Sequence, residues 1–333
     1  MKPSYLEKND IIYLIAPSFG CTTFPYEGRL KRAIKNFEKL GYKIHIGENV
    51  YKCDGICASS SSYNRAKEFM DAYESDAKII MSVGGGETMV EILEHIDFEK
   101  IKSLPPKYFV GFSDNTNLTY TLTTICDIET IYGNNAPNFY RRPFKYDTLQ
   151  TYKMLIGEKE FEGFKSFELK GFDTEFPKYN LNKRKIITAI NYNKPFEGIL
   201  LGGCLDCLVG LCGTKFDNTK NYINKHKDEG IIFYMEACDL NSIGIRRALF
   251  QLKMAGWFDN VKGFLIGRTR LYKDKSFEVT PVESYIDLLK EYNVPLLINI
   301  DLGHLSPSMP MKNGAYAKVL FENNNIKITY KGL

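Results

Sequence analysis

Short apolar runs alternate with segments of helical periodicity in the N-terminal part of the chain, and this pattern restricts the protein to few folds. Residues 11–16, 78–83 and 108–111 are apolar runs that end at Pro, Gly or polar residues, as buried strands do. Residues 30–40 and 66–73 carry apolar side chains at the spacing of one helix face. Strands joined through helices pair in parallel, and helices cover both faces of such a sheet. The sequence therefore predicts an α/β fold with a parallel sheet.

A second α/β block follows a stretch in which the alternation fades and polar residues are frequent. Apolar strands are expected at 231–235, 263–266 and 296–300, and a hairpin is expected at 317–330. We therefore divide the chain into an N-terminal domain over residues 1–160, a connector over 161–195 and a C-terminal α/β domain over 196–333.

The composition is that of a soluble globular protein with balanced charge. The chain has 333 residues, of which 44% are hydrophobic, and its 44 basic against 40 acidic residues give a net charge of +4. This balance does not indicate a nucleic-acid partner. The polar start, Met1 to Asn9, lacks the pattern of a secretory signal, and the apolar run at 11–16 is too short to span a bilayer. We expect a cytoplasmic protein without a membrane partner.

The eight cysteines are expected to be reduced thiols, because no secretory signal is recognised. Cys53, Cys57, Cys204 and Cys207 could together form a zinc site, but the paired spacing usual for zinc ligands is absent. A free cysteine is also commonly a small buried apolar side chain. We therefore predict neither a metal nor another cofactor.

Ser113 stands where the apolar run at 108–111 meets a polar sequence that starts a helix. We expect a buried strand, a sharp turn and a helix that Asp114, Asn115 or Thr116 caps. Open α/β sheets usually bind ligands at such carboxyl ends of strands. Ser113 is therefore a candidate nucleophile, although a turn or capping role is the commoner use of a lone serine.

Glu236 and His304 also follow predicted strands, at 231–235 and 296–300. A serine hydroxyl needs a base to take its proton, and the base needs a carboxylate that fixes its tautomer. His304 lies in a loop punctuated by Gly and Pro, where a base could be presented to a substrate. Glu236 could supply the carboxylate, but a carboxylate at a strand end could equally turn to solvent.

The glycine turn at 84–86 follows the predicted strand at 78–83. Its N–H groups could bind an oxyanion together with the N–H of Asp114. The turn could also hold a phosphate, but it lacks the glycine patterns of dinucleotide-binding folds and P-loops. The Gly-x-Ser-x-Gly elbow of α/β-hydrolases is missing around Ser113 as well. A non-catalytic sugar- or nucleotide-binding protein is the alternative from another class.

An ordered set of segments resembles the LD-carboxypeptidase family of serine peptidases, which includes the muramoyl-tetrapeptide carboxypeptidases and the microcin C self-immunity peptidases. The resemblance extends from Ile11 to Ala317, and the segments are Gly84 to Gly86, Val110 to Thr116, Tyr132 to Asn135, Gly202 to Asp206, Glu236 and Gly303-His304. It implies a Rossmann-like N-terminal sheet, a smaller C-terminal α/β domain, no metal and commonly a homodimer. It further implies a triad of Ser113, His304 and Glu236, with an oxyanion hole from the backbone at Gly85 and Asp114.

The chain departs from the family pattern at Cys204, where many members have Asn, and at Tyr132-Gly133-Asn134, where they have His-Gly-Pro. Both departures lie near the expected substrate site. The basic run at 183–185 of the connector resembles the microcin-immunity members and could approach a carboxylate or phosphate; whether the connector acts as a lid is left open.

We therefore predict a serine carboxypeptidase that hydrolyses an amide next to a free carboxylate. The first candidate substrate is the L,D bond of a murein tetrapeptide. The alternative is a peptidyl or aminoacyl nucleotide of the microcin type.

Overall fold

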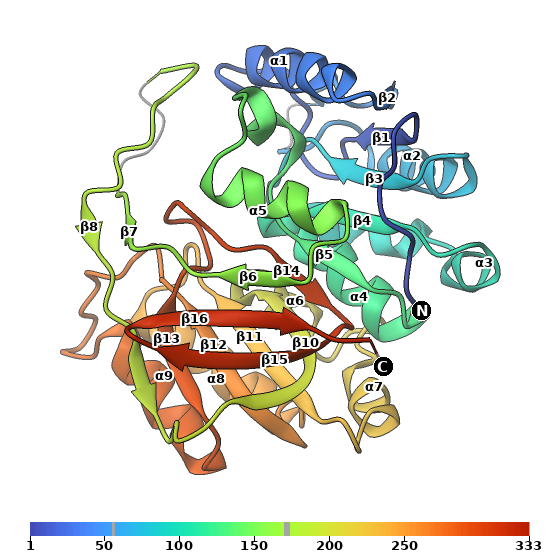
Figure 1. Ribbon diagram of the computed structural model, residues 1–333. Helices are drawn as coiled ribbons and strands as arrows, with labels where there is room; N and C mark the ends of the chain where they lie inside the picture. The colour runs from blue at the N-terminus through green and yellow to red at the C-terminus, as the bar shows by residue number, and fades with distance from the viewer. Residues whose placement is uncertain (55–56, 170–173, 333) are drawn as a thin grey trace. The chain divides into compact units, whose positions relative to one another are not determined.

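The computed structural model describes residues 1–54, 57–169 and 174–332, and the chain divides into two compact units (Figure 1). Unit 1 comprises Met1–Glu158 and Lys170–Tyr179, and unit 2 comprises Lys159–Leu169 and Asn180–Leu333. The stretch expected to be a connector, 161–195, therefore contributes to both units.

Unit 1 contains a parallel sheet with the strand order β5-β4-β3-β1-β2. All residues of β3 and β4 are buried, as expected when helices cover both faces of a sheet. The predicted parallel sheet is confirmed. The strands are β1 (Ile11–Ile15), β2 (Lys43–Ile46), β3 (Ile79–Ser82), β4 (Tyr108–Gly111) and β5 (Thr130–Tyr132).

Two helices of unit 1 show the features expected of amphipathic, capped helices. In α1, Leu30, Ala33 and Phe37 are buried along one face, and in α2 the Ser61 side chain accepts a hydrogen bond from the Asn64 N–H. The segment after the glycine turn forms a 3₁₀ helix. The helices are α1 (Tyr26–Lys39), α2 (Ser62–Glu74), η1 (Met89–His95), α3 (Phe98–Ser103), η2 (Ser113–Asn115), α4 (Thr116–Cys126), η3 (Ala136–Tyr140) and α5 (Tyr146–Leu155).

Unit 2 contains a mixed sheet with the order β6-β16-β15-β10-β11-β12-β13-β9. Strands β10 to β13 are parallel, while antiparallel strands flank them on either side. The predicted C-terminal hairpin is confirmed as β15 and β16. The strands are β6 (Glu160–Glu162), β9 (Thr188–Ile190), β10 (Phe196–Cys204), β11 (Ile231–Glu236), β12 (Val261–Gly267), β13 (Leu296–Ile300), β15 (Tyr316–Glu322) and β16 (Asn325–Tyr330).

The remaining elements of unit 2 are short. Strands β7 (Ser166–Phe167) and β8 (Lys183–Arg184) form an antiparallel pair, and β14 spans Met311–Asn313. The helices are α6 (Leu205–Leu211), α7 (Thr219–Lys225), α8 (Ser242–Met254), α9 (Pro281–Leu289) and η4 (Lys290–Tyr292). In the described part of the chain, no helix has both the length and the apolar character needed to cross a membrane.

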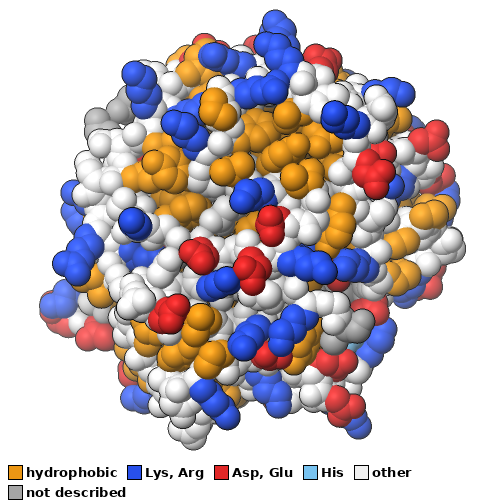
Figure 2. All heavy atoms as spheres, in the orientation of Figure 1, with side chains coloured by type: hydrophobic (Ala, Val, Ile, Leu, Met, Phe, Trp, Pro, Cys, Tyr) orange, Lys and Arg blue, Asp and Glu red, His pale blue; other side chains and the backbone are white. Residues whose placement is uncertain are grey.

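The surface matches the balanced composition. On the face drawn in Figure 2, acidic side chains are interspersed among the basic ones.

Candidate active site

Ser113 occupies a strained turn at the end of β4. Its φ angle is +66°, in the left-handed region that a serine rarely adopts. Hydrogen bonds from neighbouring residues hold this conformation. The Phe112 N–H donates to Asn135 Oδ1 at 3.0 Å, and the Ser113 N–H donates to the Tyr132 hydroxyl at 3.2 Å. Ser113 thus lies in a sharp turn between the end of β4 and the 3₁₀ helix η2.

The prediction that a polar side chain caps the helix after Ser113 is wrong. At the N-termini of η2 and α4, the N-cap residues Phe112 and Asn115 make no capping hydrogen bond with their side chains. The Asn115 amide instead donates to the carbonyls of Phe112 at 2.8 Å and Gly84 at 2.9 Å. The side chain is used to join two turns, and it therefore does not cap the helix.

Gly85 lies against Ser113 within unit 1. A Cβ atom on Gly85 would lie 3.2 Å from the Ser113 Cβ and 3.5 Å from its Oγ. A side chain at this position would therefore require Ser113 to shift by a few tenths of an ångström. The carbonyl of Gly85 accepts from the Phe19 N–H at 3.1 Å, which fixes the turn from its other side.

The Asp114 carboxylate is a buried anchor for the same turn. It accepts hydrogen bonds from the Ser18 hydroxyl at 2.5 Å, the Met89 N–H at 3.0 Å and the Asn117 amide at 2.9 Å. Burial raises the pKa of Asp114, although these donors oppose the rise. The three donors hold in place the residue whose backbone N–H was predicted as an oxyanion donor.

In unit 2, Glu236 and His304 form a close pair. Glu236 is the last residue of β11 and is fully buried, and His304 Nδ1 donates to its Oε2 at 2.8 Å. The solvated interpretation of Glu236 is therefore wrong. Burial lowers the pKa of His304, but the Glu236 carboxylate and the Cys238 side chain outweigh this effect and raise that pKa well above its ordinary value.

The backbone conformation around Glu236 and His304 allows their side chains to approach each other. Gly303 has a φ of +112°, and a Cβ atom there would lie 3.0 Å from Glu236 Oε2. On the other side of Glu236, the Asp206 carboxylate accepts from the N–H groups of Cys238 at 3.0 Å, Asp239 at 2.9 Å and Leu240 at 3.1 Å. Asp206 therefore fixes the loop that follows Glu236. This role was not predicted from the sequence, although Asp206 belongs to the segment Gly202 to Asp206 that resembles the family.

The two positions that depart from the family pattern have defined contacts. Asn134 accepts from the Thr151 hydroxyl at 2.8 Å and lies 3.4 Å from Asp147, so it ties the end of β5 to α5. Cys204 is buried, and its Sγ lies 3.5 Å from Asp206 Oδ2. Cys204 therefore lies next to the residue that holds the loop after Glu236, whereas Asn134 joins two elements of unit 1.

The four cysteines considered as zinc ligands come from two separate parts of the chain. Cys53 and Cys57 are exposed in unit 1, and Cys204 and Cys207 lie at the start of α6 in unit 2. Within the residues that the structure describes, no group of three or more His, Cys, Asp or Glu side chains is arranged to hold a metal ion.

Comparison with known families assigns both halves of the chain. Residues 12–133 match the LD-carboxypeptidase N-terminal domain, and residues 197–319 match the LD-carboxypeptidase C-terminal domain. The chain belongs to the LD-carboxypeptidase family. The resemblance inferred from the sequence motifs is thus confirmed.

Relatives within the LD-carboxypeptidase family carry two kinds of name. Microcin C7 self-immunity protein MccF of Escherichia coli is 26% identical over 321 residues, covering 92% of this chain and 90% of that protein. A probable murein peptide carboxypeptidase of Bacillus subtilis is also 26% identical over 321 residues, covering 95% and 90%. The structure of MccF in complex with glutamyl sulfamoyl guanosine has a TM-score of 0.83 at 23% identity over 99% of both chains. The predicted two-domain α/β fold is confirmed.

Proposed function

We propose that the protein is a serine carboxypeptidase of the LD type, with Ser113, His304 and Glu236 as its catalytic triad. The observation that carries the proposal is the buried Glu236 carboxylate bonded to His304 Nδ1 at 2.8 Å in a chain of this family. A carboxylate in this position fixes the tautomer of the base and stabilises its imidazolium form. The strained turn at Ser113 supports the role of that residue as nucleophile.

In the proposed reaction, Ser113 Oγ attacks the carbonyl carbon of the scissile amide while His304 Nε2 takes the hydroxyl proton. The N–H groups of Gly85 and Asp114 stabilise the negative oxygen of the tetrahedral intermediate. His304 then donates its proton to the leaving amine, which departs and leaves an acyl-enzyme. Water, deprotonated by the same imidazole, releases the acyl group and regenerates Ser113. No metal or cofactor takes part in this scheme.

Replacement of the nucleophile tests the proposal. Ser113→Ala should lower kcat by about 10⁴-fold or more, because the residual rate comes only from binding and oxyanion stabilisation. It should also abolish labelling by a serine-directed acylating reagent. Ser103→Ala, a change at an exposed serine at the end of α3, is the matched control and should leave both measurements unchanged. Near-normal hydrolysis by Ser113→Ala would refute the triad.

We propose the L,D bond of a murein tetrapeptide, which releases terminal D-alanine, as the first substrate to test. The relative named as a probable murein peptide carboxypeptidase supports this choice. MccF is equally similar by sequence identity and has been solved in complex with glutamyl sulfamoyl guanosine, which supports an aminoacyl nucleotide as the second candidate.

Both purified substrates should be compared with the same enzyme preparation. A kcat/KM at least about 100-fold higher for one of them would assign the substrate class, since this corresponds to about 2.7 kcal/mol of difference in transition-state binding. Tight binding of the nucleotide without turnover of either compound would favour the non-catalytic alternative.

A further inference from the structure

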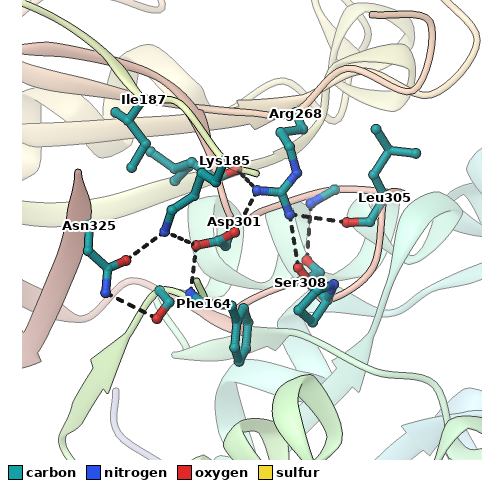
Figure 3. Close-up of polar contacts among 12 residues, drawn as sticks. Phe164, Lys185, Ile187, Arg268, Asp301, Leu305, Ser308 and Asn325 are labelled. Atoms are coloured by element: carbon teal, nitrogen blue, oxygen red, sulfur yellow. Dashed lines mark hydrogen bonds and ion pairs between the residues drawn. The ribbon is translucent and has the colours of Figure 1, made fainter. Parts of the chain in front are cut away.

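A buried charge cluster lies at the base of the loop that carries His304. Asp301 is fully buried, and the side chains of Lys185 and Arg268 are 2% and 4% exposed. Lys185 Nζ donates to Asp301 Oδ2 at 2.6 Å, and Arg268 Nη1 donates to Asp301 Oδ1 at 2.5 Å. In Figure 3 the two cations point toward the carboxylate from different sides. All three residues belong to unit 2.

Arg268 also binds the backbone on both sides of His304. Its Nη1 donates to the carbonyl of Ile300 at 3.4 Å, and its Nη2 donates to the carbonyls of Leu305 at 3.3 Å and Pro307 at 3.2 Å (Figure 3). Its backbone N–H donates to the carbonyl of Leu302 at 3.0 Å. One arginine at the end of β12 thus contacts the loop before and after the proposed base.

Asp301 contributes contacts of its own to this arrangement. Its carbonyl accepts from the Met309 N–H at 2.7 Å, which closes the loop. Its carboxylate also accepts from the Phe164 N–H at 2.7 Å. Phe164 and Lys185 both come from the stretch predicted as a connector, so this stretch contacts the base of the His304 loop.

The chemistry of Lys185, Arg268 and Asp301 indicates that the cluster orients the loop more than it stabilises the fold. A buried ion pair is costly to desolvate, and apolar residues of similar volume often stabilise a fold equally well. The carbonyls of an irregular loop, however, need donors, and a planar guanidinium offers five in a fixed geometry. The Arg268 guanidinium also stacks on the Phe167 ring, 4.5 Å from its centroid, which restricts its rotation.

We propose that Arg268 and Asp301 are positioning residues for the peptidase reaction: they hold the 300–309 loop so that His304 keeps its bond to Glu236, and Lys185 links the connector to this loop. The inference rests on the proposed function and adds to it the residues that orient the base. A misplacement of about 1 Å in a catalytic group can lower the rate about 100-fold.

Arg268→Lys tests the proposal because it keeps the charge and removes the fork of donors. We expect kcat to fall about 10- to 100-fold while KM changes less than about twofold, since the base is misplaced and the substrate contacts are retained. Leu252→Ala is the matched control, because it removes buried volume from α8 of the same unit and none of the hydrogen bonds to the 300–309 loop. Its unfolding midpoint should fall while kcat stays within about twofold.

A second measurement follows His304 directly. The Nδ1 proton bonded to Glu236 should give a downfield proton resonance, which His304→Gln would identify by its loss. Arg268→Lys should shift or broaden this resonance, and Leu252→Ala should leave it unchanged. Unchanged kcat and an unchanged resonance in a folded Arg268→Lys protein would overturn the inference.

If Arg268→Lys does not fold, Lys185→Met provides a second variant that tests whether the cluster positions His304. It replaces one cation by an apolar side chain and leaves the Asp301–Arg268 pair. We expect a smaller fall in kcat, about 3- to 10-fold, with the same resonance displaced; an unchanged rate and resonance would count against the link to the connector. A wild-type protein inactive on both candidate substrates would refute the proposed function, whereas the resonance would still report whether the cluster positions His304.

Discussion

The turn around Ser113 in unit 1 and the loop around His304 in unit 2 are held in place by different physical means. The turn around Ser113 is short, and neutral side-chain acceptors and a closely packed glycine hold its left-handed residue. The His304 loop is longer and irregular, and buried charges at Arg268 and Asp301 hold it. A short turn can be fixed by backbone geometry, whereas a long loop needs side chains that bridge its two flanks.

Of the changes that test this comparison, replacement of Glu236, the carboxylate bonded to His304, should have the largest effect on kcat. Glu236→Gln should lower kcat by about 10⁴-fold, because the amide no longer fixes the imidazole tautomer or stabilises the imidazolium. Since Glu236 raises the pKa of His304, the variant should also move the acid limb of the kcat/KM profile to lower pH. A pH–rate profile for both proteins measures this, and an unmoved limb would contradict the assignment of His304 as the base.

A smaller effect is expected where the glycine turn meets the nucleophile. Gly85→Ala places a Cβ 3.2 Å from the Ser113 Cβ, so the serine must shift by a few tenths of an ångström. We expect kcat to fall about 10- to 100-fold in a folded protein. Gly210→Ala is the matched control, because an added Cβ there meets nothing within 4 Å in α6. Equal rates for the two variants would show that the turn does not constrain Ser113.

The hydroxyl that anchors the turn around Ser113 should affect stability more than rate. Ser18→Ala removes the 2.5 Å hydrogen bond to the buried Asp114 carboxylate. The free energy of unfolding should fall by about 1–3 kcal/mol, because a buried acceptor loses a donor, while kcat should fall less than about tenfold. Urea unfolding of this variant beside Ser103→Ala provides the measurement. A stability equal to that of Ser103→Ala would mean that the bond contributes nothing.

The smallest effect concerns the pH dependence of stability. The pKa of His304 in the folded protein is raised above the unfolded value of about 6.5. The protonated pair therefore stabilises the fold fully below pH 6.5, and this stabilisation is lost as the pH rises through the folded pKa. Urea midpoints measured upward from pH 6 should show this loss in the wild type and in His45→Gln, a change at an exposed histidine. His304→Gln should flatten it, and an unchanged slope would contradict the expected coupling.

The sequence allowed most of the parallel strands in both sheets to be predicted, because apolar runs are local features. The Glu236–His304 bond, by contrast, joins residues 68 positions apart, and only folding places them together. Strands β6 and β9 were missed because short segments with polar residues become strands only by pairing with β16 and β13.

The prediction of a side-chain cap at the start of α4 was wrong because it, too, depends on long-range contacts. Asn115 has a side chain suited to capping, but the approach of the glycine turn gives it other partners. Asp301 was visible in the sequence beside His304, yet its cations lie 33 and 116 positions away. Local patterns indicate candidate site residues, and long-range contacts decide which side chains lie against them.

Strand β9 covers the edge of the strand that leads to His304. It pairs with β13 at the end of the unit 2 sheet, so the strand that leads to His304 is not the sheet's open edge. Within the described residues, β9 is the outermost strand at this end of the sheet, and its three residues are too few to template the addition of another chain. Changes in this part of the chain that detach β9 should therefore cause aggregation before they alter substrate choice.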